Sequence, residues 1–163
     1  MAFRDYEEFI ASLNANGVRY LIVGAHALAK HVRPRATVDL DIWIDRTAPN
    51  ARRVLAALRH FYKGTEVSYT VDKILDPENI LRLGLRPSCI EVFTDLVSSL
   101  TFKKAWSNRV VSEFGSVDAN FVGLEDLILL KSDSGRPQDL ADVEKLNRAL
   151  KEIRKRLSRK SIH

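Results

Sequence analysis

Two acidic residues inside an otherwise apolar run constrain this chain more than any other feature. The run is residues 38–44 (VDLDIWI), and its period-two alternation is typical of a strand. On a strand, Asp39 and Asp41 project from the same face, about 7 Å apart along the chain. Leu40 and Ile42 project to the other face, where burial in the core sets the register. The apolar neighbours indicate a buried central strand, in which unpaired carboxylates are costly. We therefore interpret the two acids as functional, although a solvated strand face is the commoner meaning of Asp-x-Asp.

Length and composition indicate one globular domain over residues 1–163. The chain is 45% hydrophobic and 29% charged, with seven glycines and five prolines, which excludes collagen-like, low-complexity and largely disordered chains. The single cysteine, Cys89, cannot form an intrachain disulfide. No apolar run approaches the roughly 18–20 residues that span a bilayer, and the first ten residues lack the pattern of a signal peptide. We expect a cytoplasmic protein without membrane contact.

The positive charge is concentrated at the C-terminal end. The whole chain has a net charge of +5, but residues 148–163 hold seven Lys and Arg against one Glu, a balance of +6. Residues 1–147 therefore sum to −1. We interpret residues 148–163 as a basic helical tail on a nearly neutral domain. A solvated helix face is the commoner meaning of such a run, and binding of phosphates is the functional alternative.

The order of the predicted elements favours an α+β or α/β fold. The expected helices are residues 4–15, 25–30, 50–61, 101–106, 124–131 and a long last helix that starts at Pro137. The expected strands are residues 19–23, 38–44 and 89–93, with a hairpin formed by residues 109–113 and 117–122. We expect residues 65–88 to form strand fragments joined by turns.

Gly24 adds a second component to the predicted site. It lies between a short β-rich run and a run of helix formers, so the backbone there can approach a ligand closely. The helix that follows would present free N–H groups and its positive dipole end to phosphates. Paired carboxylates on a strand suit Mg²⁺, which takes one or two carboxylates and leaves its other positions to water and phosphate oxygens. Two such ions could activate an attacking hydroxyl and steady a pyrophosphate leaving group.

Together these residues resemble the first motif of the nucleotidyltransferase superfamily, and in particular that of AbiEii-type toxin nucleotidyltransferases. Arg35, Thr37, Asp39 and Asp41 match its Arg-x-Thr-x-Asp-x-Asp pattern. The resemblance implies an α+β, polymerase-β-like fold, with a small mixed sheet flanked by helices and a C-terminal helical hairpin. It also implies Mg²⁺ or Mn²⁺ as the cofactor and nucleotide binding by Gly24, Ala25, Arg35 and Thr37. Ala25 departs from the pattern, because the superfamily prefers Gly or Ser there.

The resemblance also implies a third carboxylate on a neighbouring strand. The candidate is Glu91 in the run CIEVFT, as a metal ligand or as the base for the acceptor hydroxyl. Relatives mostly have Asp at this place, and the extra methylene of Glu shifts the carboxylate oxygens by over about 1 Å. An ordinary strand-face acid is the alternative reading of Glu91, and Asp95 is the other candidate for the third carboxylate.

A second resemblance to the toxin family lies near the C-terminus. Lys131, Arg136, Asp139 and Asp142 match a Lys followed by Arg…Asp-x-x-Asp across a helix–turn–helix. Lys131 ends an apolar helix, so that its stem could lie along the core while its ammonium reaches a triphosphate. Asp139 and Asp142 lie three apart on one helical face and could orient Lys131 or Arg136. A structural network that closes the hairpin is the alternative reading.

These motifs predict transfer of a nucleoside monophosphate from an NTP to an acceptor hydroxyl, with release of pyrophosphate. The expected catalytic residues are Asp39, Asp41, Glu91 and Lys131; the first three would hold metal, and Lys131 and Arg136 would bind nucleotide phosphates. The family resemblance implies a toxin with a cognate antitoxin and tRNA as a possible acceptor. The alternatives are a small-molecule (antibiotic-type) nucleotidyltransferase and a catalytically weak or inactive member that binds nucleotide or RNA.

Overall fold

A computed structural model describes residues 3–32, 39–85, 88–96 and 98–160. Within these residues the chain forms seven helices and six strands. In chain order these are α1 (Phe3–Ala15), β1 (Tyr20–Ile22), α2 (Gly24–His31), β2 (Leu40–Ile44), α3 (Ala48–Phe61), α4 (Val71–Leu75), β3 (Leu81–Leu85), β4 (Ser88–Phe93), α5 (Phe102–Ser107), β5 (Val110–Phe114), β6 (Val117–Phe121), α6 (Leu124–Ser134) and α7 (Pro137–Lys160). The fold is of the α+β class, as predicted.

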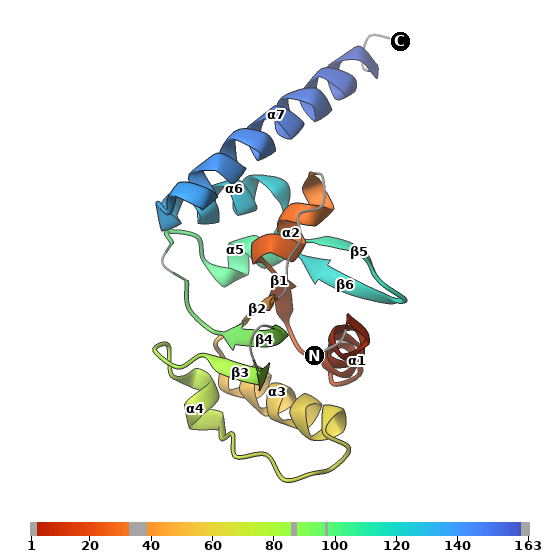
Figure 1. The fold of residues 1–163 in the computed structure, drawn as a ribbon, viewed down its shortest axis with the longest axis vertical. Coiled ribbons are helices and arrows are strands. Elements are labelled where there is room, and N and C mark those ends of the chain that lie inside the picture. Colours follow the sequence, from red (N-terminus) through yellow and green to blue (C-terminus); the bar gives the residue numbers. More distant parts are fainter. Residues whose placement is uncertain (1–2, 33–38, 86–87, 97, 161–163) are drawn as a thin grey trace.

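The strands form one mixed sheet in the order β3-β4-β2-β1-β6-β5. β2 pairs in parallel with β4, and β1 pairs in parallel with β6, whereas the other three pairs are antiparallel. The strand with the two acids thus lies in the interior of the sheet. Its neighbour β4 lies about fifty residues further along the chain, and Figure 1 shows the two strands side by side.

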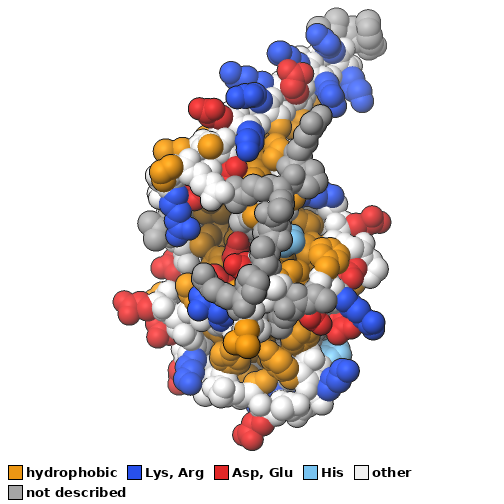
Figure 2. Space-filling view, viewed as in Figure 1, with side chains coloured by type: hydrophobic (Ala, Val, Ile, Leu, Met, Phe, Trp, Pro, Cys, Tyr) orange, Lys and Arg blue, Asp and Glu red, His pale blue; other side chains and the backbone are white. Residues whose placement is uncertain are grey.

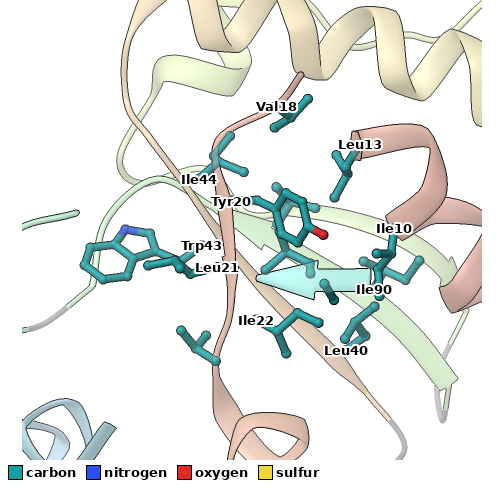
Figure 3. Close-up of a cluster of buried hydrophobic side chains, with 14 of the residues drawn as sticks. Ile10, Leu13, Val18, Tyr20, Leu21, Ile22, Leu40, Trp43, Ile44 and Ile90 are labelled. Carbon is teal, nitrogen blue, oxygen red and sulfur yellow. The ribbon is translucent and has the colours of Figure 1, made fainter. Parts of the chain in front are cut away.

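The helices divide into two groups on either side of the sheet. α3 contacts both α1 and α4, and α2 packs with α6 and α7 (Figure 1). Alternate residues of the central strands face the first group: Figure 3 shows Ile10 and Leu13 of α1 beside Tyr20, Ile22, Leu40 and Ile90. These six side chains are fully buried. Their burial sets the register of the central strands, because a slip of one residue would turn them all to the other face.

The opposite face of the same strands carries Asp41 and Trp43. Trp43 is almost completely buried, packs edge-on against Phe102 of α5 at 5.2 Å between ring centroids, and donates from its indole N–H to the carbonyl of Thr94 at 3.2 Å. On this face of the sheet the apolar core therefore extends to Trp43, two residues along β2 from Asp41. Further along the chain, α6 and α7 form a helical hairpin whose turn contains Gly135 at φ 63°, in the left-handed region that glycine adopts readily.

The predicted elements agree with the structure except between residues 65 and 88. There the prediction of strand fragments is wrong for residues 71–75, which form the short helix α4. The Thr70 hydroxyl caps this helix by accepting a hydrogen bond from the Lys73 N–H at 3.3 Å. The strand β3 does form in this stretch, at residues 81–85. The basic tail is helical through Lys160.

Candidate functional site

Three charged side chains stand in one row across β3, β4 and β2. Glu91 is the register partner of Asp41 on one side and of Arg82 on the other. Register partners project to the same face with Cβ atoms about 5 Å apart. Arg82 contacts Glu91 directly, because its Nε and Nη2 lie 2.9 and 2.7 Å from the same carboxylate oxygen, Oε1. The sheet thus places two acids beside each other with a guanidinium at the outer end.

Gly24 contacts the inner acid of this row. Its φ is +64°, and a Cβ built at this position would overlap the Asp41 Oδ2 atom. The preceding residue is tied to the same strand, since the Val23 N–H donates to the Asp41 carbonyl at 3.0 Å. Gly24 begins α2, whose N-terminus has no side-chain cap. The Asp41 carboxylate therefore lies directly at the start of a helix, as close as a residue without a side chain permits.

Asp39 lies immediately before β2 and is held by Cys89. The Cys89 backbone N–H and Sγ lie 3.1 and 3.2 Å from the Asp39 Oδ1 atom. Cys89 is fully buried, and burial is the main cause of the raised pKa of its thiol, with the hydrogen bond to Asp39 second. The thiol is therefore a neutral donor to the Asp39 carboxylate. Asp39 itself is half-buried.

The electrostatics of Asp41 show that both halves of the predicted site meet. Its pKa is raised to about 6, first by burial and then by the negative charges of Glu91 and Asp39. Lys131 and Arg136 act in the opposite direction and lower the same pKa. Four charged residues from separate parts of the chain thus act on one carboxyl group.

Lys131 is buried between two carboxylates at the start of α7. Its Nζ donates to Asp139 Oδ1 at 2.8 Å and to Asp142 Oδ2 at 2.9 Å. The side chain of Asp142 is 1% exposed, that of Lys131 9% and that of Asp139 20%. Burial raises the pKa of Asp139, but hydrogen bonds from Lys131 and Ser134 outweigh it and leave this pKa lowered. In this structure the ammonium closes the α6–α7 hairpin.

The remaining predicted residues lie in different settings. Arg35 and Thr37 fall outside the described residues, Ala25 is half-buried in the first turn of α2, and Arg136 is exposed in the turn between α6 and α7. Asp95, the other candidate for the third carboxylate, is exposed beyond β4. Two contacts of the site were not predicted: that of Arg82 with Glu91 and that of Cys89 with Asp39. Period-two alternation in residues 81–85 was the available signal for Arg82, but it does not identify the partner strand.

The donor set fits Mg²⁺ in its two-carboxylate mode. Asp39 and Asp41 supply hard oxygen donors, and the crowding of negative charge around Asp41 is what a divalent cation relieves. Within residues 3–32, 39–85, 88–96 and 98–160, no group of three or more His, Cys, Asp or Glu is arranged to hold a metal ion. Asp39 and Asp41 match the one or two carboxylates that Mg²⁺ takes from a protein.

A family comparison identifies the class of protein to which this fold and these acids belong. The family model described as "Nucleotidyltransferase of unknown function (DUF6036)" matches residues 2–153, and the chain belongs to this family. The resemblance to the nucleotidyltransferase superfamily is thereby confirmed. No curated protein matches the chain. Among the described residues, no helix has both the length and the apolar character required to cross a membrane.

Proposed function

We propose that this protein is a nucleotidyltransferase of polymerase-β-like fold that transfers a nucleoside monophosphate from an NTP to an acceptor hydroxyl in the presence of Mg²⁺ or Mn²⁺. The single observation that carries the proposal is the set of residues around Asp41: Asp39 from the same strand region, Glu91 in register, Gly24 in contact, and Lys131 and Arg136 within electrostatic reach. Family membership supports the reaction class.

In this proposal Asp39 and Asp41 hold the metal ion. When bound, the ion would neutralise charge on the triphosphate and on the acceptor oxygen. Cys89 fixes the orientation of Asp39 through the two hydrogen bonds to its Oδ1. Glu91, one strand further out, would accept the proton of the acceptor hydroxyl or add a third ligand.

The triphosphate would lie between α2 and the α6–α7 turn. The uncapped N-terminus of α2 at Gly24 and Ala25 offers backbone N–H groups to phosphate oxygens. Arg136, exposed in the turn, and Lys131 supply positive charge from the other side. Lys131 would exchange its contact with Asp139 for a phosphate, since Asp139 is the more exposed of its two partners. Arg35 and Thr37 are proposed phosphate contacts from the motif alone.

The α7 arm, defined as residues 148–160, favours a polyanionic acceptor such as tRNA. Figure 2 shows Lys and Arg side chains gathered along α7 where it projects from the body. All side chains of residues 151–160 are exposed, and Arg154 pairs with Glu125 of α6 at 2.8 Å. A long cationic helix face can follow a phosphate backbone. We further propose, on the motif resemblance, one cytoplasmic domain over residues 1–163 that acts as a toxin with a cognate antitoxin.

A transfer assay tests the proposal. The protein is incubated with each α-labelled NTP, MgCl₂ or MnCl₂, and either total tRNA or a panel of small hydroxylated acceptors. Label is expected on tRNA, with loss in D39A and D41A and in EDTA; label on a small molecule alone would support the antibiotic-type alternative. NTP binding without transfer to any acceptor would overturn the enzymatic proposal and support a nucleotide-binding member of the family. D118N, which removes an exposed carboxylate, is the matched control.

A further inference from the structure

Glu91 belongs to two groups at once: it is the register partner of Asp41 and the ion-pair partner of Arg82. We propose that Arg82 is a positioning residue that holds the Glu91 carboxylate back from the metal position, so that Glu91 becomes a metal ligand only when this pair opens. The inference rests on the proposed function, because it assumes that Asp39 and Asp41 hold the ion.

The geometry of the pair supports this role. Both Arg82 contacts converge on Glu91 Oε1, at 2.9 Å from Nε and 2.7 Å from Nη2. The register between β3 and β4 places Arg82 opposite Glu91 in every conformation of the two side chains. Among the described residues, Glu91 does not join Asp39 and Asp41 in a three-acid metal group, although Glu91 is the in-register neighbour of Asp41. The Arg82 guanidinium lies at the outer end of the row, on the side of Glu91 away from Asp41.

The exposure of the pair makes it reversible. The side chain of Arg82 is 47% exposed and that of Glu91 is 18% exposed. Such a pair contributes little free energy, so a divalent cation with a bound triphosphate can compete for the carboxylate. The contrast with Lys131 is clear, because that ammonium and its partner Asp142 are both buried. The site therefore combines one buried ion pair, Lys131–Asp142, and one exposed pair, Arg82–Glu91, that can open.

Titration with Mn²⁺, followed by electron paramagnetic resonance of the free ion, tests the inference without an activity assay. We expect R82Q to bind Mn²⁺ up to about fivefold more tightly than the wild type, the factor that corresponds to an exposed ion pair. In an E91Q background the same R82Q change should alter the affinity by less than about twofold. R53Q, which removes an exposed arginine from α3, is the control, and R82M replaces R82Q if the latter does not fold.

The variants separate the possible failures. Equal affinity of R82Q and the wild type, together with loss of binding in D41N, would overturn the role of Arg82 and leave the proposed function intact. Equal tightening by R82Q with and without Glu91 would also overturn it, since Arg82 would then act by its charge alone. Absence of any Mn²⁺ binding that depends on Asp41 would overturn both the proposed function and this inference.

Discussion

The Asp41 carboxylate occupies the space that a side chain on Gly24 would require. The contact joins the first residue of α2 to Asp41, the second residue of β2, and the Val23 N–H donates to the carbonyl of the same aspartate. The Asp41 carboxylate can approach the backbone this closely because glycine has no side chain.

Substitution of Gly24 by Ala should therefore impair both folding and metal binding. Gly17 is the matched control, because its φ of +62° is nearly that of Gly24 but nothing lies within 4 Å of a Cβ built there. We expect G17A to lose about 1–2 kcal/mol from the strained backbone alone. G24A should lose about 1–3 kcal/mol more, since the new methyl displaces Asp41. Urea denaturation measures the difference, and equal losses would contradict the proposed contact. Mn²⁺ binding should survive only in G17A.

The raised pKa of Asp41 predicts that this acid destabilises the fold at neutral pH. Because the folded pKa is about 6 and the ordinary value is 3.8, the folded state binds this proton more tightly than the unfolded state does. The contribution of Asp41 to the free energy of unfolding is therefore largest below about pH 4 and is lost as pH rises through about 6. At pH 7 we expect D41N to be roughly 1–3 kcal/mol more stable than the wild type. At pH 4 the two should be equal.

Urea denaturation at both pH values checks this expectation, with D118N as the exposed control. A gain in D41N that is the same at pH 4 and pH 7 would show that it does not come from the charge of Asp41. Loss of stability at pH 7 would show that the carboxylate is stabilised by its surroundings.

Lys131 should be essential for stability whether or not it contacts phosphate. Its removal leaves Asp142, 1% exposed, as a buried charge without its main partner. We expect K131M to lose about 3–5 kcal/mol. Lys145 approaches the same carboxylate at 3.8 Å from the exposed side, and K145M should change stability by no more than about 1 kcal/mol. Thermal and urea denaturation of the pair tests this; similar losses in both would contradict the buried network.

The α7 arm should contribute to binding of a polyanion without affecting the core. The quadruple variant K151Q/K155Q/R156Q/R159Q removes four exposed charges and leaves the Arg154–Glu125 pair in place. We expect weaker tRNA binding and a slope of log affinity against log salt that is shallower by about 3–4. The melting temperature and Mn²⁺ binding should not change.

Four exposed charges on α3 and just after it provide the control of equal net charge. R52Q/R53Q/R59Q/K63Q removes the same charge from the side of the sheet opposite α7 (Figure 1). Equal weakening of tRNA binding by both variants would show that only the total charge of the protein matters.

The sequence predicted those parts of the site that depend on local spacing. The period-two alternation around Asp39 and Asp41 predicts a strand, and β2 forms there. Its burial is greater than on a strand with one solvated face, because Trp43, on the face of Asp41, is buried as well. The three-residue spacing of Asp139 and Asp142 places both on one face of α7, where Lys131 contacts them.

The unpredicted parts depend on pairing between distant segments. The contact of Arg82 with Glu91 follows from the β3–β4 register, and the neighbourhood of Asp41 and Glu91 follows from parallel pairing of strands fifty residues apart. Neither is encoded in a short window of residues. The prediction failed for α4 for a different reason. Five residues are too few to show a periodicity, and the hydroxyl cap at Thr70 decides the local structure.

Helix α7 is one unbroken rod from Pro137 to Lys160, with no glycine or further proline inside it. Asp139 and Asp142 lie in its first two turns, and Lys160 lies about 27 Å beyond Asp142 at 1.5 Å per residue. The two ends of a continuous helix move together. A displacement of residues 148–160 would therefore move Asp139 and Asp142 as well, the two carboxylates that hold the Lys131 ammonium.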